Sequence, residues 1–254
     1  MKFTLAKVKT VSESDLLLVC TFKAKAKKNA KPFDCKAVLE LDKELSGQLT
    51  AQAQNEGFVA DEGSSFSTFT FGKKGRSISL LGLGETSAQS VDLFRKAGGE
   101  AFKIANKKQA KKLSLVISEK TTIALFDVVQ ALTEGMILAS YRFDKYRTKD
   151  PKETYLKEVE FHLPEAPTAE LKQAITHAEE IAHGVCLARD LINDGPTELN
   201  PQKFTEHALK AAKDAGLNIE VLDEKKLLKE RMGLMLAVAR AAQSFAPPRL
   251  IRIH

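Results

Sequence analysis

An apolar run near the N-terminus sets the strongest limit on the fold. The segment DLLLVCTF (15–22) carries apolar residues at almost every position instead of alternating them with polar ones. A strand of this kind lies inside a sheet that is covered on both faces. It is also far shorter than the roughly 20 apolar residues that a membrane-spanning helix requires. We therefore expect an α/β domain built around this strand.

Strand and helix patterns alternate through residues 1–164. Apolar runs and period-two alternation predict strands at 2–8, 15–22, 64–71, 77–84, 113–117 and 156–163. Apolar residues at helical spacing predict helices at 37–54, 86–109 and about 121–141. The turn residues GKKGR (72–76) predict a hairpin or a neighbouring pair of strands. This order indicates one α/β domain that ends near residue 164.

Two prolines, Pro164 and Pro167, separate this domain from the rest of the chain. Thr168 is a candidate N-cap for a long helix. Its apolar residues form one stripe: Leu171, Ala174, Ile175, Ala178, Ile181, Ala182, Val185 and Ala188. Turn-forming residues in LINDGPTELNP (191–201) end the helix. We expect a linker helix at 165–192 and a second domain from residue 193.

The second domain is expected to be incomplete. Its patterns predict helices at 202–215 and 224–232, and three parallel-type strands at 218–223, 234–239 and 248–253. About 60 residues with three such strands cannot cover both faces of an α/β sheet. The last segment, PPRLIRIH (247–254), stops inside an apolar strand, which suggests a fold that is cut or that awaits a partner.

Composition and cysteine usage indicate a globular, reduced protein. The chain has 254 residues, of which 43% are hydrophobic and 28% charged. Its first residues, MKFTLAKVKT, lack the apolar stretch of a secretory signal. Cys20, Cys35 and Cys186 show no metal-binding spacing. We therefore expect a cytoplasmic protein without a membrane partner.

Two lysine clusters account for much of the basic character. The formal net charge is +6, and KAKAKKNAK (23–31) and KIANKKQAKK (103–112) hold five lysines each. Neither cluster is interleaved with the aromatic or arginine side chains that read bases. Solvated surface is therefore favoured, and a sequence-independent contact with DNA stays open as an alternative.

The segment GLGETSA (82–88) is a weak candidate for phosphate binding. It follows a strand and precedes a helix, but Ser87 replaces the third glycine of G-x-G-x-x-G and no P-loop lysine follows. A tight strand-to-helix turn is favoured. Phosphate or ADP-ribose binding remains an alternative that rests on fold analogy.

No catalytic, metal-binding or cofactor-binding residue can be assigned from the residues themselves. The carboxylates of Asp190, Asp194 and Glu198 fix no coordination geometry, and Asn193 and Asp194 fit turn and capping roles better. Cys186 is expected to be a small core residue rather than a nucleophile. The five histidines are scattered and are interpreted as surface or packing residues: His162, His177, His183, His207 and His254.

Several segments, in order along the chain, resemble the N-terminal half of leucyl (cytosol) aminopeptidases. The most specific is CLARDLINDGPTELNPQKF (186–204), followed by NIEVLDEKKLLKERMGLMLAVARA (218–241) and APPRLIRIH (246–254). Upstream, SLLGLGETSAQSVDLFRKAGGEAFKIA (79–105) and SYRFDKYRTK (140–149) are similar to N-terminal-domain signatures. The loop ARAAQSFA (239–246) and Asp194-Gly195 depart from the family pattern.

This resemblance implies a fold and an activity. It implies a macro-like N-terminal α/β domain with a mixed sheet at 1–164, the linker helix, and the beginning of an α/β catalytic domain at 193–254. In the family, a cytosolic homohexamer uses two divalent cations, Mn or Zn, to activate the water that attacks the N-terminal peptide bond. The metal-binding segment is expected to lie beyond residue 254. We therefore carry over no catalytic or metal residue and predict that the chain alone is inactive.

Overall fold

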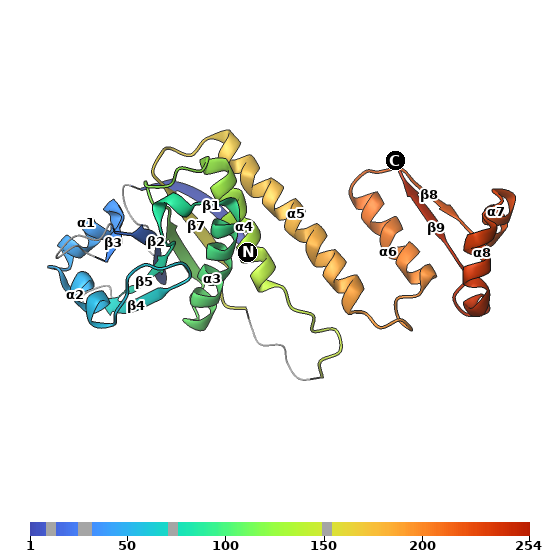
Figure 1. Cartoon of the computed structure of the whole chain (residues 1–254), viewed down its shortest axis with the longest axis horizontal. Coiled ribbons are helices and arrows are strands. Elements are labelled where there is room, and N and C mark those ends of the chain that lie inside the picture. The colour runs from blue at the N-terminus through green and yellow to red at the C-terminus, as the bar shows by residue number, and fades with distance from the viewer. Residues whose placement is uncertain (9–13, 25–31, 71–75, 149–153) are drawn as a thin grey trace. The chain divides into compact units, whose positions relative to one another are not determined.

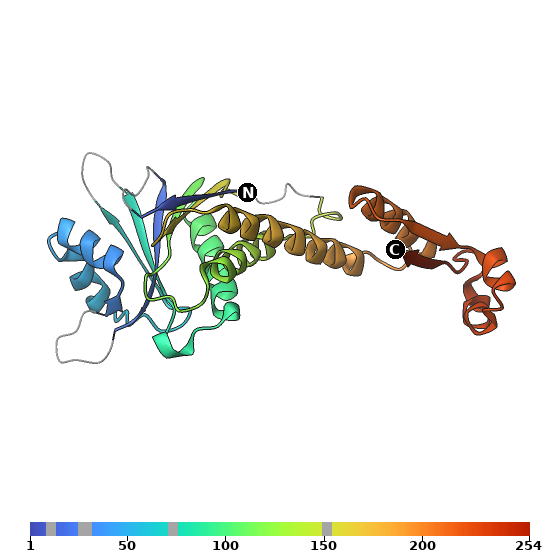
Figure 2. The same ribbon diagram turned by 90° about the horizontal axis from the view of Figure 1, so that it is seen from above.

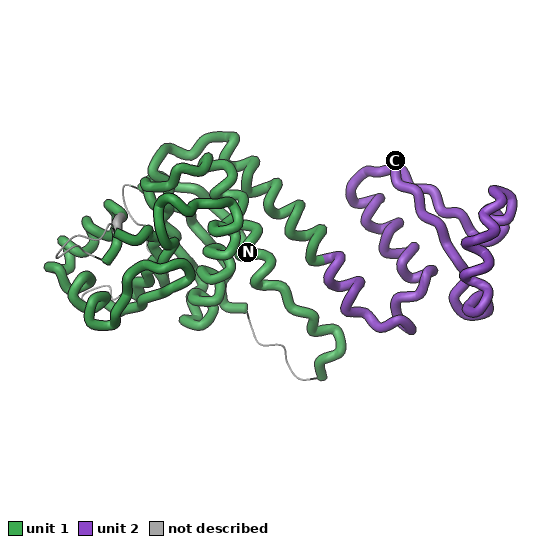
Figure 3. Tube along the Cα trace, in the orientation of Figure 1, with its two compact units in different colours: residues 1–186 green, residues 187–254 purple. Residues whose placement is uncertain are grey.

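The chain forms two compact units in a computed structural model, which describes residues 1–8, 14–24, 32–70, 76–148 and 154–254. Unit 1 comprises residues 1–186 and unit 2 comprises residues 187–254 (Figure 1; Figure 3). The boundary falls inside helix α5 (Ala169–Asn193). Each unit has its own strands and is described by itself.

A mixed sheet forms the centre of unit 1. Its strands run in the order β1-β7-β6-β2-β5-β4, with the short β3 paired to β2. The first five of these are parallel, whereas β4 and β3 pair antiparallel to their neighbours. Their bounds are β1 (Lys2–Lys7), β2 (Leu16–Lys23), β3 (Phe33–Asp34), β4 (Ser65–Thr70), β5 (Arg76–Gly82), β6 (Lys112–Val116) and β7 (Glu158–Leu163). The predicted α/β class and mixed sheet are confirmed, and the predicted turn at 72–76 lies almost wholly outside the described residues.

Strand β2 requires helical layers on both faces of the sheet. Every residue of β2 except Lys23 is buried. Side chains alternate between faces, so Leu16 and Leu18 enter one hydrophobic core while Leu17 and Val19 enter the other. Helices α3 (Val91–Lys107) and α4 (Leu125–Ser140) cover the first face. Helices α1 (Lys36–Glu44) and α2 (Gln48–Asn55) cover the second, on the opposite side of the sheet (Figure 2).

Two glycines allow α3 and α4 to pack closely. A Cβ atom added to Gly98 would overlap the backbone carbonyl of Leu132, and one added to Gly135 would overlap that of Arg95. The helix backbones therefore touch at these positions without intervening side chains. Gly99 lies one residue along α3, and a Cβ atom there would make only ordinary contacts at 3.7 Å.

The predicted single helix over 37–54 is wrong, because a break separates α1 from α2. Ser46 and Gly47 adopt φ angles of 54° and 80°, in the left-handed region that ends helices. The carboxylate of the buried Asp42 then accepts a hydrogen bond from the backbone N–H of Thr50 at 2.8 Å. Asp42 thus satisfies a donor in the first turn of α2, which stabilises the second helix as a separate element.

The helix predicted from residue 86 also begins later than expected. A single 3₁₀ turn, η1 (Thr86–Ala88), precedes α3. The Ser90 hydroxyl accepts from the Leu93 N–H at 3.1 Å, so Ser90 is the N-cap. The predicted N-cap at Thr168 is confirmed, since its Oγ1 accepts from the Leu171 N–H at 3.2 Å.

Unit 2 has few elements and a two-stranded sheet. After the end of α5 come α6 (Pro201–Asp214), β8 (Ile219–Leu222), α7 (Glu224–Lys229), α8 (Gly233–Ala239), η2 (Arg240–Ala242) and β9 (Leu250–Ile253). The predicted strand over 234–239 is wrong, because LMLAVA lies in α8. Leu, Met and Ala favour helix, and a short apolar run has no period that separates the two states.

The two strands of unit 2 pair antiparallel, which corrects the expected parallel arrangement. Ile219 lies opposite Ile253, and Leu222 lies opposite Leu250. Two short helices connect these strands, whereas a parallel pair is usually joined by a single crossover helix. Among the described residues, no helix is both long and apolar enough to cross a membrane.

Candidate functional site

The glycines that follow β5 serve the packing of the strand end. The backbone N–H groups of residues 82–84 donate to the carbonyl oxygens of Ser64, Thr21 and Ala60 at 2.8, 2.9 and 2.9 Å. A Cβ atom on Gly82 would overlap the Asp61 carbonyl, and Gly84 adopts a φ of +74°. These amides are therefore engaged within the chain and do not form a cradle for phosphate. The turn interpretation fits, although a 3₁₀ turn separates the strand from α3.

A cavity of about 410 Å³ lies beside this strand end. Its floor is formed by residues 81–83 of β5 and the following turn, and its wall by Leu93 and Ala97 of α3. Glu62, Lys96 and Glu100 supply the charged side chains of its lining. A ligand could use only those of these three charged side chains that are not already paired within the chain.

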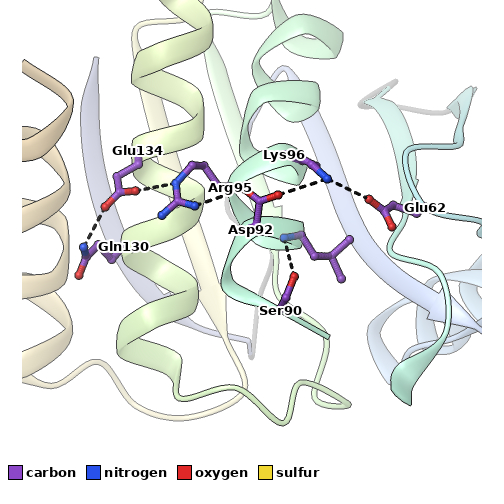
Figure 4. Close-up of polar contacts among 8 residues, drawn as sticks. Glu62, Ser90, Asp92, Arg95, Lys96, Gln130 and Glu134 are labelled. Atoms are coloured by element: carbon purple, nitrogen blue, oxygen red, sulfur yellow. Dashed lines mark hydrogen bonds and ion pairs between the residues drawn. The ribbon is translucent and has the colours of Figure 1, made fainter. Parts of the chain in front are cut away.

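The lysine of this cavity is already paired. Lys96 Nζ lies 3.2 Å from Asp92 Oδ2 and 3.7 Å from Glu62 Oε1 (Figure 4). Hydrogen bonding to Lys96 lowers the pKa of Asp92, and hydrogen bonding to Asp92 raises the pKa of Lys96. Glu100 lies 2.7 Å from Lys103 Nζ. Lys96 thus pairs with Glu62 across the cavity and Glu100 is paired within α3, which favours a structural role over ligand binding.

The same network continues to a buried carboxylate in α4. Glu134 is almost fully buried and accepts from Arg95 Nε at 2.8 Å and from Gln130 Nε2 at 2.8 Å. Arg95 also reaches Asp92 at 3.4 Å, and its bond to Glu134 raises the pKa of the guanidinium (Figure 4). A buried carboxylate is costly unless it is paired and hydrogen-bonded. Arg95 therefore joins α3 to α4 at the point where Gly135 brings the backbones together.

The described residues include only part of the two lysine clusters. Residues 25–31 of the first cluster lie outside the described part of the chain. The second spans the end of α3 and the start of β6, where Lys103 pairs with Glu100.

The histidines occupy packing and surface positions. His162 is fully buried in β7, with its Nε2 3.0 Å from Glu160 Oε2. The His177 ring meets the Phe126 ring edge-on, with centroids 5.9 Å apart. His177 itself is exposed, as are His183, His207 and His254. The interpretation of these residues from the sequence agrees with their positions.

The junction carboxylates belong to a helix end. The Asp194 N–H donates to the Asp190 carbonyl oxygen at 3.1 Å, directly after the last residue of α5. Asn200 then caps α6 by accepting from the Lys203 N–H at 3.0 Å. Across the described ranges, no three His, Cys, Asp or Glu side chains come together in a way that would hold a metal ion.

The cysteines differ in environment. Cys20 and Cys35 are buried, and burial raises the pKa of their thiols to about 12 and about 11. A thiol with such a pKa is a poor nucleophile at neutral pH. Cys186 is half-buried, so the expectation that it is a core residue is wrong. The apolar stripe of α5 is exposed in this region, at Ile181 and Val185.

The most distinct surface feature of unit 2 was not found from the sequence. A groove of about 680 Å³, here called the unit 2 groove, runs beside α8. Leu234 and Val238 lie one helical turn apart on α8 and are 88% and 86% exposed. The lining of the unit 2 groove is apolar except for one arginine: Pro201, Leu234, Met235, Val238, Ala239, Ala242, Ala246, Pro248 and Arg249. The i, i+4 spacing of Leu234 and Val238 did not reveal the groove, because a strand also places residues i and i+4 on one face.

Comparison with family models gives two matches in order along the chain. Residues 19–150 match the N-terminal domain of the cytosol aminopeptidase family, and residues 186–254 match its catalytic domain. The chain belongs to the cytosol aminopeptidase family. The predicted resemblance is therefore confirmed.

Relatives in this family are longer than the chain. A probable cytosol aminopeptidase of Syntrophotalea carbinolica is 32% identical over 223 residues, which cover 86% of this chain and 44% of the relative. One from Sulfurihydrogenibium sp. is 34% identical over 220 residues, covering 84% and 42%. The chain thus spans less than half the length of these curated relatives.

Solved structures of similar fold are also matched over only about half of their own length. A tomato leucine aminopeptidase mutant superposes with a TM-score of 0.86 at 24% identity, and the match covers 100% of this chain and 50% of that one. The bottromycin maturation enzyme BotP in complex with Mn gives a TM-score of 0.70 at 23% identity, covering 95% and 45%. At these identities the likeness concerns the fold alone.

Proposed function

We propose that this chain provides the N-terminal domain and the first part of the catalytic domain of an aminopeptidase that removes N-terminal residues from peptides. The observation that carries the proposal is the order of the two family matches, at 19–150 and 186–254, on a chain that spans about half of a relative. In this proposal residues 1–164 form the N-terminal domain and residues 165–192 the linker helix. Residues 193–254 begin the catalytic domain.

Catalysis is assigned to polypeptide that this chain does not include. The family resemblance implies two divalent cations, and one similar structure is an enzyme in complex with Mn. The described residues of this chain do not fit such a centre, because no three potential ligand side chains gather there. No step through a metal is derived for them. The chain alone is proposed to have no peptidase activity.

The proposed role of unit 1 is structural. Its cavity charges pair with one another, its glycine amides bond to its own backbone, and its buried thiols are poor nucleophiles at neutral pH. Such a unit suits assembly and control of access to a catalytic site formed elsewhere. Assembly into a homohexamer and a cytoplasmic location are part of the proposal, and the name cytosol aminopeptidase of the relatives supports the location.

An aminopeptidase assay tests this proposal. The purified chain, checked by intact mass, is incubated with leucine p-nitroanilide and added Mn²⁺. We expect no release of p-nitroaniline above the buffer control, whereas the full-length Syntrophotalea carbinolica relative serves as the positive control. Turnover that scales with the concentration of the pure chain would overturn the proposed inactivity.

DNA binding by the lysine clusters is the second candidate, and the structure gives it little support. Lys103 is engaged by Glu100, and a contact with phosphates would have to be strongly salt-dependent. Titration of the chain with duplex DNA at low and moderate salt distinguishes the two functions. Affinity that is negligible, or unchanged by salt, would exclude the binding module.

A further inference from the structure

We propose that the unit 2 groove is a docking surface for the polypeptide that corresponds to the second half of the relatives' chain, and that this chain binds that polypeptide even when it is supplied as a separate molecule. The inference rests on the proposed function. It goes further by naming the surface, the partner and the residues that make the contact.

The first support is the exposure of the groove. Leu234 and Val238 stand on the same side of α8, and both are almost fully exposed. Pro248 and Pro201 form apolar walls beside them. Soluble proteins rarely expose a contiguous apolar surface unless it binds something. The groove therefore has the properties of an uncovered core face.

The second support is the small core of unit 2. Few residues of 187–254 are buried, and they are Thr205, Ala212, Leu222, Leu227 and Pro248. The sheet consists of β8 and β9, and a two-stranded sheet is marginally stable in water without further strands or helices. A further large apolar side chain, Phe245, is 73% exposed next to Ala246 of the groove lining. Residues 187–254 thus do not supply all the layers needed to cover the sheet and the apolar side chains of unit 2.

The third support identifies the occupant. Residues 186–254 match the catalytic-domain model of the family, so unit 2 is part of that domain. The 223-residue match, which covers 86% of this chain, accounts for only 44% of the Syntrophotalea carbinolica relative, so more than half of that relative has no counterpart in the match. A domain buries its apolar faces against its own other elements. The missing part of the catalytic domain is therefore favoured over a second copy of this chain, which would bring the same incomplete unit.

The contact has a definite chemistry. Leu234 and Val238 present an apolar strip one helical turn long, and Met235 and Ala239 lie beside it. Arg249 stands at the edge of the groove, where its guanidinium also donates to the Pro248 carbonyl at 2.8 Å. An apolar helix or strand face with an acidic or carbonyl group at its rim would match this surface.

The test uses the full chain and a defined probe. The probe is the part of the Syntrophotalea carbinolica relative that lies C-terminal to its matched segment, produced as a separate polypeptide. The relative's own matched segment serves as the positive control for binding by this probe. Isothermal titration calorimetry and light scattering should show a one-to-one complex with the full chain. No complex with this chain, while the positive control binds, overturns the proposal.

Variants locate the contact on the groove. Leu234→Asp and Val238→Asp should each weaken binding by at least about tenfold, because a carboxylate would be buried without a partner. The milder Val238→Ala should weaken it by a smaller factor. Leu228→Asp is the matched control, since Leu228 is also exposed but lies outside the groove lining, and its Kd should stay within about twofold. Groove variants that bind as tightly as the unchanged chain contradict the proposed surface.

Binding and activity are separate readouts. A complex that forms but stays inactive with Mn²⁺ supports the docking surface and argues against the proposed aminopeptidase function. A covalent fusion of chain and probe that is active, while the separate molecules do not bind, supports the function and overturns the docking inference. If the chain alone forms a dimer that Leu234→Asp dissociates, the occupant is a second copy and the proposal is wrong.

Discussion

Units 1 and 2 of this chain use similar apolar residues with opposite results. In unit 1, strand β2 lies between two helical layers and all but one of its residues are buried. In unit 2, the two strands of the sheet have few covering elements, and Leu234 and Val238 of α8 face solvent. An apolar pattern therefore specifies a core only where enough elements surround it. Unit 1 contains its covering layers, whereas few residues of unit 2 are buried.

The largest expected effect separates the two sheets in hydrogen exchange. The β2 amides should exchange at least about a thousandfold more slowly than those of β8, because protection follows the stability of the element that contains them. Native-state exchange read by mass spectrometry measures this ratio. Equal protection of β2 and β8 would mean that unit 2 is stable by itself, and the contrast between the units would fail.

The glycine contact between α3 and α4 provides the next test, since it holds one covering layer of unit 1. Gly135→Ala should lower the free energy of unfolding of unit 1 by about 3 kcal/mol, because the new methyl group overlaps the Arg95 carbonyl and forces the helices apart. Denaturation in urea, followed by circular dichroism, gives the value.

Gly99→Ala is the matched control for this change. A methyl group at Gly99 meets only ordinary contacts, and Ala favours helix over Gly by up to about 1 kcal/mol. We expect unchanged or slightly higher stability. If both variants destabilise unit 1 equally, close backbone packing is not the reason for the glycine at position 135.

The Arg95–Glu134 pair is expected to have a smaller effect. Arg95→Met leaves the buried Glu134 carboxylate without its cation and should cost about 2 kcal/mol of unfolding free energy, a value reduced because Arg95 itself is partly exposed. Lys103→Met, which breaks the exposed Lys103–Glu100 pair, should cost less than about 0.5 kcal/mol. Equal losses of unfolding free energy in Arg95→Met and Lys103→Met would show that burial of Glu134 does not strengthen its ion pair.

The smallest effect concerns a helix cap in unit 2. Asp223 accepts from the Lys226 N–H at 3.0 Å, and this hydrogen bond lowers the pKa of the carboxyl group. Because the folded pKa lies below the unfolded one, the cap contributes fully above the ordinary Asp pKa and is lost as the pH falls through the folded value. NMR titration of the Lys226 amide should follow this transition. Asp223→Asn, which caps without titrating, should abolish it, and a transition that persists in this variant would refute the assignment.

Secondary structure was predictable where a residue's local pattern and its tertiary environment agree. The strand at 15–22 and the N-cap at Thr168 were predicted from short stretches, and the structure has both. The prediction of one helix over 37–54 failed because the buried Asp42 accepts from the Thr50 N–H and so stabilises the first turn of a second helix, α2. The strand at 234–239 failed because six apolar residues suit either conformation.

The candidate sites depended on contacts that spacing does not reveal. The segment 82–88 was a weak candidate for phosphate binding with a turn favoured, and its first amides bond to residues that precede it by about twenty positions or more. That the scattered histidines and junction carboxylates bind no metal stays a prediction. The unit 2 groove was missed, because it exists only when 234–239 is helical and the segment after η2 folds back beside it.

By itself, the sequence determined the α/β class, the covered central strand and the family. It could do so because strand burial and helix capping depend on residues a few positions apart. Only the tertiary structure decided the glycine contact between α3 and α4, the buried Arg95–Glu134 pair and the exposed groove of unit 2. These features join residues distant in the chain, and their energies depend on which atoms are in contact and which surfaces remain in water.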